Sequence, residues 1–211
     1  MQISIIPVTP FQQNCSVLRC DETRKGAVVD PGGDLELVLE AIRSEEIEVE
    51  KILLTHGHID HAGATKALRE KLGVPVIGPQ REDEFLLESL AAQGRMFGVG
   101  EAEAFSPDQW LAHGDSVQVG NERFEVRHCP GHTPGHVIFY SAARSFALVG
   151  DVLFDGSIGR TDLPRGDYQT LMTSIREQLL SLPDDTTFLP GHGPTSTIGA
   201  QRRGNPFLRG L

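Results

Sequence analysis

Short apolar runs, separated by glycine and proline turns, alternate with amphipathic stretches through the first half of the chain. The apolar positions in 34–43 repeat at i, i+3, i+4 and i+7 and predict a helix, with Asp34 as its N-cap. A second helix is predicted over 63–72, directly before a glycine. Strand-like runs occupy 3–8, 15–20, 27–30 and 52–54. This alternation of strands and helices indicates the α/β class.

The second half of the chain has a different pattern, with strand-like runs close together at 116–119, 124–128, 137–140 and 146–149. One amphipathic helix is predicted near the end, over 167–182. Because β-rich stretches occur beside helices in both halves, we expect two sheets flanked by helices rather than a single doubly wound sheet. The stretch 93–107 contains three glycines and is predicted to be a surface loop.

Length, charge and cysteine content narrow the class of protein. The 211 residues suit one domain over 1–211. A net charge of −10 argues against a nucleic-acid partner, because phosphate binding needs a basic face. The N-terminus lacks the basic and apolar regions of a secretory signal, and no stretch approaches the roughly 18 apolar residues of a membrane span. The three cysteines form no CxxC pair. We therefore expect a cytoplasmic protein with no membrane and no obligate protein partner.

The most informative segment is Thr55-His56-Gly57-His58-Ile59-Asp60-His61, which follows a predicted strand. His56 and His58 are two residues apart, so both imidazoles can point to the same side. Asp60 and His61 lie where the chain turns into a helix and can point toward a neighbouring position. One short loop can therefore offer two ligands to each of two metal ions.

Later segments offer the ligands that would complete two such sites. Each candidate lies at the end of an apolar run and next to a glycine, where strands deliver side chains to an edge: His132, Asp151 and His192.

The strings THGHIDH, GHTPGH, GD and GHG, in this order, resemble the metallo-β-lactamase superfamily over nearly the whole chain. The resemblance implies a four-layer αβ/βα sandwich with the metals in a cleft at one edge. It also implies that Asp151 bridges two metal ions. The expected ligands of metal 1 are His56, His58 and His132, and those of metal 2 are Asp60, His61 and His192. Of the other histidines, His136 is expected to support the site and His113 to lie in a loop. His128 precedes Cys129 near the site, and both a role there and a plain strand-end position are left open.

This ligand set implies two divalent ions, with zinc expected first and iron or manganese also suited to histidine and carboxylate ligands. Two ions about 3.5–4 Å apart can share a water and lower its pKa toward neutrality. The expected nucleophile is the bridging hydroxide, which attacks the substrate carbonyl. Asp60 and Asp151 are the expected catalytic residues, with Asp60 orienting the hydroxide as well as binding metal.

Within the superfamily, the strings FQQNC, GRTDL, PGHGPTS and NPF resemble the glyoxalase II group, the hydroxyacylglutathione hydrolases, and above all its small type II-like members. The resemblance implies hydrolysis of S-lactoylglutathione or a related acyl thiol to a hydroxy acid and a thiol. Asp151 counts against a true β-lactamase. Longer glyoxalase II enzymes continue into a basic helical region that holds glutathione, whereas only 193–211 follow the last histidine here. Arg160 is the candidate to meet a substrate carboxylate, and a turn held by Arg160 and Asp162 is the alternative.

Three other functions are considered. A persulfide dioxygenase would use one iron, bound by His56, His132 and Asp151, and would leave metal site 2 empty. It shares the GRTD string, whereas the string around His192 favours the hydrolases. A lactone or other ester hydrolase of the same fold is a second alternative. A non-catalytic metal-binding module is disfavoured, because all seven ligand positions are filled.

Overall fold

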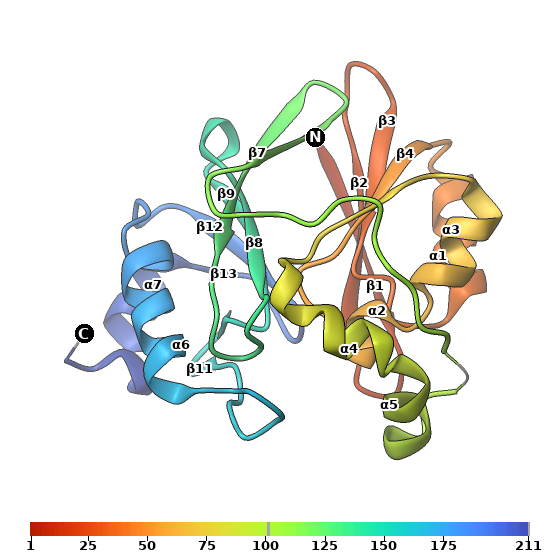
Figure 1. Ribbon diagram of the computed structural model, residues 1–211. Coiled ribbons are helices and arrows are strands. Elements are labelled where there is room, and N and C mark those ends of the chain that lie inside the picture. The colour runs from red at the N-terminus through yellow and green to blue at the C-terminus, as the bar shows by residue number, and fades with distance from the viewer. Residues whose placement is uncertain (101, 211) are drawn as a thin grey trace.

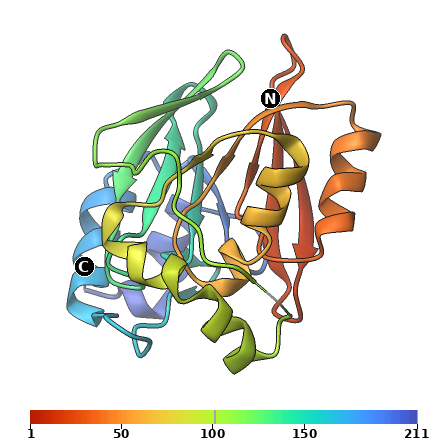
Figure 2. The same cartoon turned by 45° about the vertical axis from the view of Figure 1, so that its right-hand side comes forward.

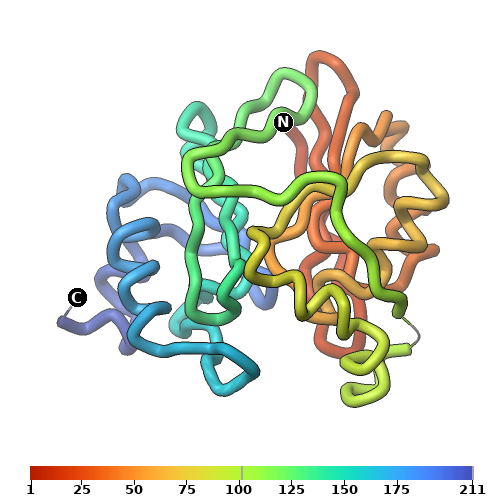
Figure 3. Tube along the Cα trace, in the orientation of Figure 1, coloured from red at the N-terminus to blue at the C-terminus, as the bar shows by residue number. Residues whose placement is uncertain are grey.

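In the computed structural model, which describes residues 1–100 and 102–210, two β-sheets face each other and helices cover their outer sides (Figure 1). The first half of the chain builds one sheet with its helices, and the second half builds the other (Figure 3). A view turned by 45° has the same order of layers (Figure 2).

The first sheet has the strand order β1-β2-β3-β4-β5. β1 to β3 are antiparallel, and β3 to β5 are parallel. The strands are β1 (Gln2–Val8), β2 (Gln13–Arg19), β3 (Lys25–Val29), β4 (Glu48–Leu53) and β5 (Val76–Ile77). The parallel connections are made by α1 (Leu35–Ser44) and α3 (Thr65–Leu72). Val38, Leu39 and Ile42 form the buried face of α1, as their spacing predicted.

The second sheet has the order β13-β12-β9-β8-β7-β6. Its strands are β6 (Ser116–Val119), β7 (Glu122–His128), β8 (Val137–Ser141), β9 (Phe146–Gly150), β12 (Thr187–Pro190) and β13 (Ser196–Thr197). A short hairpin of β10 (Leu153–Phe154) and β11 (Ser157–Ile158) lies outside it. The outer helices are α6 (Tyr168–Ser174), its π-helical continuation Ile175–Leu179, and α7 (Ile198–Gly204).

The core between the sheets is built from side chains of both. Leu18, Leu53, Phe124, Phe139 and Leu189 are at most 3% exposed and belong to one apolar cluster. Burial of such side chains stabilises the fold by roughly 1.5–3 kcal/mol each. The two sheets between helix layers confirm the expected α/β sandwich.

Two details differ from the sequence predictions. Asp34 stands at the N-cap position with φ 46°, but its side chain accepts a hydrogen bond from Thr9 N at 2.7 Å and does not cap the helix. The predicted loop 93–107 begins inside a helix, α5 (Leu90–Phe97), which follows α4 (Glu84–Glu88). Residue 101 of that stretch lies outside the described residues.

Packing explains why the glycines of 93–107 led to the wrong prediction of a loop where the structure has a helix. Leu90 is fully buried, and a Cβ atom on Gly94 would lie 2.6 Å from the carbonyl oxygen of Gly100. Gly94 therefore permits close approach within a helix and does not mark a loop. Gly98, with φ 66°, ends the helix in the left-handed conformation. No helix of the described chain is long and apolar enough to cross a membrane.

Candidate metal centre

Four loops at one edge of the two sheets carry the seven side chains singled out from the sequence. The loop after β4 continues into the short helix α2 (Ile59–Ala62) and carries His56, His58, Asp60 and His61. The β7–β8 loop carries His132, the end of β9 is followed by Asp151, and the end of β12 is followed by His192. Because strand ends deliver these residues, segments far apart in the sequence meet here.

The first group consists of three buried imidazoles. His56 Nε2 lies 3.1 Å from His58 Nδ1, and His58 Nδ1 lies 3.0 Å from His132 Nε2. The three nitrogens converge on one point. Nitrogens about 3 Å apart can share a single ion at the usual zinc–nitrogen distance of about 2.0–2.1 Å.

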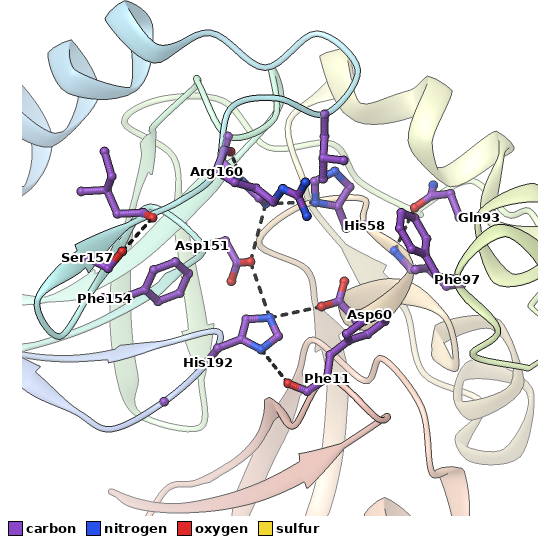
Figure 4. A pocket seen from close by; sticks show the side chains of 15 residues that line it. Phe11, His58, Asp60, Gln93, Phe97, Asp151, Phe154, Ser157, Arg160 and His192 are labelled. Carbon is purple, nitrogen blue, oxygen red and sulfur yellow. Dashed lines mark hydrogen bonds and ion pairs between the residues drawn. The ribbon is translucent and has the colours of Figure 1, made fainter. Parts of the chain in front are cut away.

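The second group consists of Asp60, His61 and His192. His192 Nε2 lies 3.1 Å from Asp60 Oδ2, and His61 Nε2 lies 3.9 Å from the same oxygen. Asp151 faces both groups, with Oδ1 3.3 Å from His61 Nε2 and Oδ2 3.6 Å from both His132 Nε2 and His192 Nε2. Figure 4 shows Asp60, Asp151 and His192 pointing toward one another.

These residues fit divalent metal ions. His61 Nε2 and Asp151 Oδ1 are buried and have no hydrogen-bond partner in the described part of the chain, although buried polar atoms are nearly always partnered. Imidazole nitrogens with carboxylate oxygens form a donor set suited to zinc, iron or manganese. The two orphaned atoms lie 3.3 Å from each other on the side of the second group, where an ion would satisfy both.

The charge states of the two groups differ. Burial, followed by the neighbouring His132, lowers the pKa of His58 to about 3, and burial holds the pKa of His56 well below its ordinary value. Burial also acts to lower the pKa of His61, but Asp151 and Asp60 outweigh it and the pKa lies well above the ordinary value. The first group therefore presents neutral imidazoles, whereas the carboxylates of the second group favour the protonated form of His61.

Asp30 supports the site and was missed in the sequence. Its Oδ2 lies 2.9 Å from His61 Nδ1 and accepts from Thr55 Oγ1 at 2.6 Å, while Oδ1 accepts from Thr55 N at 2.7 Å. Asp30 lies close enough to His56 and His61 to form a third ligand group. Its oxygens are already engaged, however, so it orients His61 through the nitrogen that faces away from the second group. The signal was an aspartate at the end of a predicted strand.

Asp83 is the second missed carboxylate, and it joins two of the ligand loops. It accepts from Gly57 N at 2.9 Å, Thr133 Oγ1 at 2.8 Å and Gly135 N at 2.6 Å. Burial raises its pKa to about 6, against the hydrogen bonds that lower it. Nothing in the local sequence around Asp83 marked it.

The remaining histidines lie behind or away from the centre. His136 Nε2 accepts from Asp151 N at 3.0 Å, and its ring stacks on His56 with centroids 4.7 Å apart. Gly150, with φ 47°, passes so close that a Cβ atom there would lie 2.7 Å from the His136 ring. His128 ends β7, which is one of the two positions that the sequence left open, and His113 lies exposed in a turn, as predicted.

Residues 11–14, the string FQQN of the sequence, contact His192 of the second group and the backbone beside it. The carbonyl oxygen of Phe11 lies 3.1 Å from His192 Nδ1. Asn14 Nδ2 donates to the carbonyl oxygens of Pro190 and Gly193 at 3.1 and 2.9 Å. Phe11 in the β1–β2 turn thus orients the His192 ring, while Asn14 at the start of β2 holds the backbone on either side of it.

A cleft of about 500 Å³ opens beside the two groups. Phe11, Phe97 and Phe154 line it (Figure 4). Arg160 also lines it, but its guanidinium forms a two-pronged pair with Asp162, which is the alternative that the sequence left open.

Known proteins are similar over the whole of this architecture. A sequence profile described as the Metallo-beta-lactamase superfamily matches residues 8–192. The chain is 48% identical to hydroxyacylglutathione hydrolase GloC from Haemophilus influenzae, over 99% of this chain and 98% of that protein. The crystal structure described as BLEG-1 B3 metallo-beta-lactamase is 38% identical with a TM-score of 0.91, over 99% of this chain and all (100%) of that one. TTHA1623, described in a di-iron-bound form, is 38% identical with a TM-score of 0.89, over 97% and 100%.

The profile covers far more than half of the chain, and the relatives share its full length as well as its layers. The chain therefore belongs to the metallo-beta-lactamase superfamily and is a metal-dependent hydrolase of that family.

Proposed function

We propose that the protein hydrolyses acyl thioesters, namely S-lactoylglutathione or a related acyl thiol, to a hydroxy acid and a thiol. The observation that carries the proposal is the position of Asp151, whose carboxylate faces both groups of ligands at once. The similarity to a hydroxyacylglutathione hydrolase over nearly the whole chain supports the choice of substrate class.

Each group would hold one ion, and Asp151, which faces both groups, would contribute a carboxylate oxygen to each. Zinc is the ion we expect first, because the first group offers three imidazoles. Iron and manganese suit the same donors, and a relative described in a di-iron-bound form supports iron. The second group, Asp60, His61 and His192, is already assembled, which favours two ions over the single iron of a persulfide dioxygenase.

Bound ions would supply a water of lowered pKa and polarise the carbonyl oxygen of the thioester. Asp60 supplies the carboxylate of the second group, and its Oδ2, 3.1 Å from His192 Nε2, is placed to orient that water. His192 in turn holds Asp60 from the side of the β12 loop. No general acid is needed for the leaving group, because thiols have an ordinary pKa of about 8.5.

The wider setting follows from composition. Three free and buried cysteines suit a reducing compartment, and we propose a cytoplasmic location. The net charge of −10 favours a small-molecule substrate over nucleic acid.

Metal-replete protein is expected to hydrolyse S-D-lactoylglutathione, measured as loss of thioester absorbance and release of free thiol. A β-lactam and a lactone belong in the same series, because one relative is described as a B3 metallo-beta-lactamase. Thioester turnover far above both would support the proposal. Turnover of only a β-lactam or lactone would refute the substrate class. Oxygen consumption with a persulfide, by protein holding a single iron, would identify the dioxygenase instead.

Lowering the pH is expected to release metal from the second group before the first. The pKa of His61 and that of His192 lie above the ordinary value, because the carboxylates beside them outweigh burial. The pKa values of His56 and His58 lie below it. As the pH falls, protons therefore displace metal from His61 and His192 first.

Two variants separate the groups in this experiment. His192→Ala retains the first group, and His58→Ala retains the second. Metal per chain is measured after dialysis at steps between about pH 8 and pH 5, the range in which histidine titrates. His192→Ala should hold its metal to a lower pH than His58→Ala. The reverse order would show that the charge states assigned to the two groups are wrong.

A further inference from the structure

The loop 55–61, which carries four of the seven ligands, is held at a third backbone N–H besides the two whose hydrogen bonds Asp30 and Asp83 accept. Ile59 N, at the first residue of α2, donates to Gln93 Oε1 at 3.0 Å. The first N–H groups of a helix have no acceptor within that helix, so Gln93 satisfies a donor that α2 cannot satisfy itself. Because Gln93 belongs to α5, this hydrogen bond joins α5 to the loop.

The Gln93 amide is also fixed through its nitrogen. Nε2 donates to the carbonyl oxygen of Leu86 at 2.8 Å and to Ser89 Oγ at 3.2 Å. These two acceptors and the Ile59 donor match one orientation of the amide, with the nitrogen toward α4 and the oxygen toward α2. A side chain held at both ends fixes the first residue of α2 relative to α4 and α5.

The helix α2 depends on such contacts for its position. It has four residues, and it carries Asp60 and His61 of the second group. A helix of one turn has too few internal hydrogen bonds to be stable alone. Gly32 packs against the carbonyl of Asp60 so closely that a Cβ atom on Gly32 would overlap it. The turn at Gly32 and the Gln93 amide therefore both fix where α2 places its two ligands.

We infer that Gln93 is a positioning residue of the metal centre, which holds the start of α2 and thereby sets Asp60 and His61 in place for the second ion. The inference rests on the proposed two-ion hydrolase and adds a residue to it. Gln93 also lines the cleft, one helical turn before Phe97 (Figure 4). Its competing role is a direct contact with substrate. Loss of positioning lowers kcat, whereas loss of a substrate contact raises KM.

Gln93→Met tests the hydrogen bond itself, because methionine has a similar length and lacks the acceptor for Ile59 N. Amide exchange of the zinc-loaded protein, followed by NMR, detects the hydrogen bond without any substrate. The Ile59 amide should exchange at least about tenfold faster, while the Gly57 amide, which Asp83 still holds, should keep its wild-type rate. Gln93→Glu retains an oxygen that can accept from Ile59 N and should recover most of the protection.

Metal binding and kinetics show whether this hydrogen bond matters at the centre. In a zinc titration against a chromophoric chelator, Gln93→Met should bind the second ion about threefold to tenfold more weakly, with the first ion within about twofold of wild type. The expected loss is smaller than the roughly tenfold to hundredfold for a group that bonds a ligand directly. With zinc saturating, kcat for the thioester should fall about threefold to tenfold, and KM should stay within about twofold.

Gln201→Met is the matched control. Gln201 lies in α7 beside the other sheet and is 3% exposed. Its amide also accepts from a backbone donor, Gly156 N at 2.9 Å, and donates to Asp155 Oδ1 at 2.7 Å. The same substitution there removes comparable hydrogen bonds without touching α2. The exchange rate of the Ile59 amide and the affinity for the second ion should therefore equal those of the wild type.

The outcomes separate this inference from the proposed function. Unchanged Ile59 exchange or unchanged second-ion affinity in Gln93→Met would overturn the inference, and so would equal changes in Gln201→Met. A rise in KM with constant kcat would overturn it by making Gln93 a substrate contact. Wild-type protein that hydrolyses no thioester would overturn the proposed function, whereas amide exchange and the zinc titration would still decide the role of Gln93.

Discussion

Replacing Asp151 with alanine is expected to abolish hydrolysis and to lower the metal content of the purified protein at the same time. The carboxylate lies 3.3 Å from His61 and 3.6 Å from both His132 and His192. Burial acts to raise its pKa, but the three imidazoles outweigh burial and hold the pKa far below the ordinary value. Asp151 is therefore ionised throughout the usual assay range.

The size of the effect follows from burial. Removing one partner of a buried charged group costs about 3–5 kcal/mol, because the other partner is left uncompensated. Taken as lost metal affinity, this is roughly two to four powers of ten. The measurements are metal per chain by atomic emission and kcat/KM for the thioester.

His113→Ala is the control for Asp151→Ala. His113 is exposed in a turn away from the centre, so metal content and kcat/KM should stay within about twofold of the wild-type values. An Asp151→Ala protein that kept both its metal and its activity would show that the metal centre is misassigned.

The second large effect is expected from Asp83→Ala, which should destabilise the fold around the metal centre. Asp83 is fully buried and accepts hydrogen bonds from Gly57, Thr133 and Gly135. Alanine would leave three buried donors unpaired, at about 1–3 kcal/mol for each such group. Because these costs are not additive, we expect a loss of roughly 3–5 kcal/mol in the free energy of unfolding.

Chemical denaturation in the presence of a chelator measures this loss without the contribution of bound metal. Glu82→Ala is the matched control, since it removes a carboxylate from the adjacent exposed position. Its free energy of unfolding should change by less than about 0.5 kcal/mol. Equal stability of the two variants would mean that Asp83 does not hold the ligand loops together.

The periodic elements were predicted well because their signals are local. The spacing of Val38, Leu39 and Ile42 alone predicted α1 and its buried face. The helix α5 was not predicted, because its glycines suggested a loop. The reason for Gly94 is a tertiary contact, since the carbonyl oxygen of Gly100 packs where a Cβ atom on Gly94 would lie. Asp34 stands at the expected N-cap position, but its carboxylate accepts a hydrogen bond from the backbone N–H of Thr9 in the first hairpin instead of capping the helix.

At the candidate metal centre, too, some residues were predicted from the sequence and others were not. The residues that converge were predicted from ligand chemistry and from their positions beside glycines at strand ends. The residues that hold them were missed, because Asp30 contacts Thr55 across 25 positions and Asp83 contacts Thr133 across 50. Such contacts leave no pattern in either segment alone.

By itself, the sequence determined the α/β class and the superfamily, because side-chain periodicity and the order of metal-binding motifs can be read along the chain. Only the tertiary structure decided that Asp151 faces two groups at once, that Asp83 ties the ligand loops together and that Arg160 is paired with Asp162. The physical reason is that each of these depends on which strand ends and loops pack side by side. That packing sets distances and burial, and these in turn set the charge that each side chain carries.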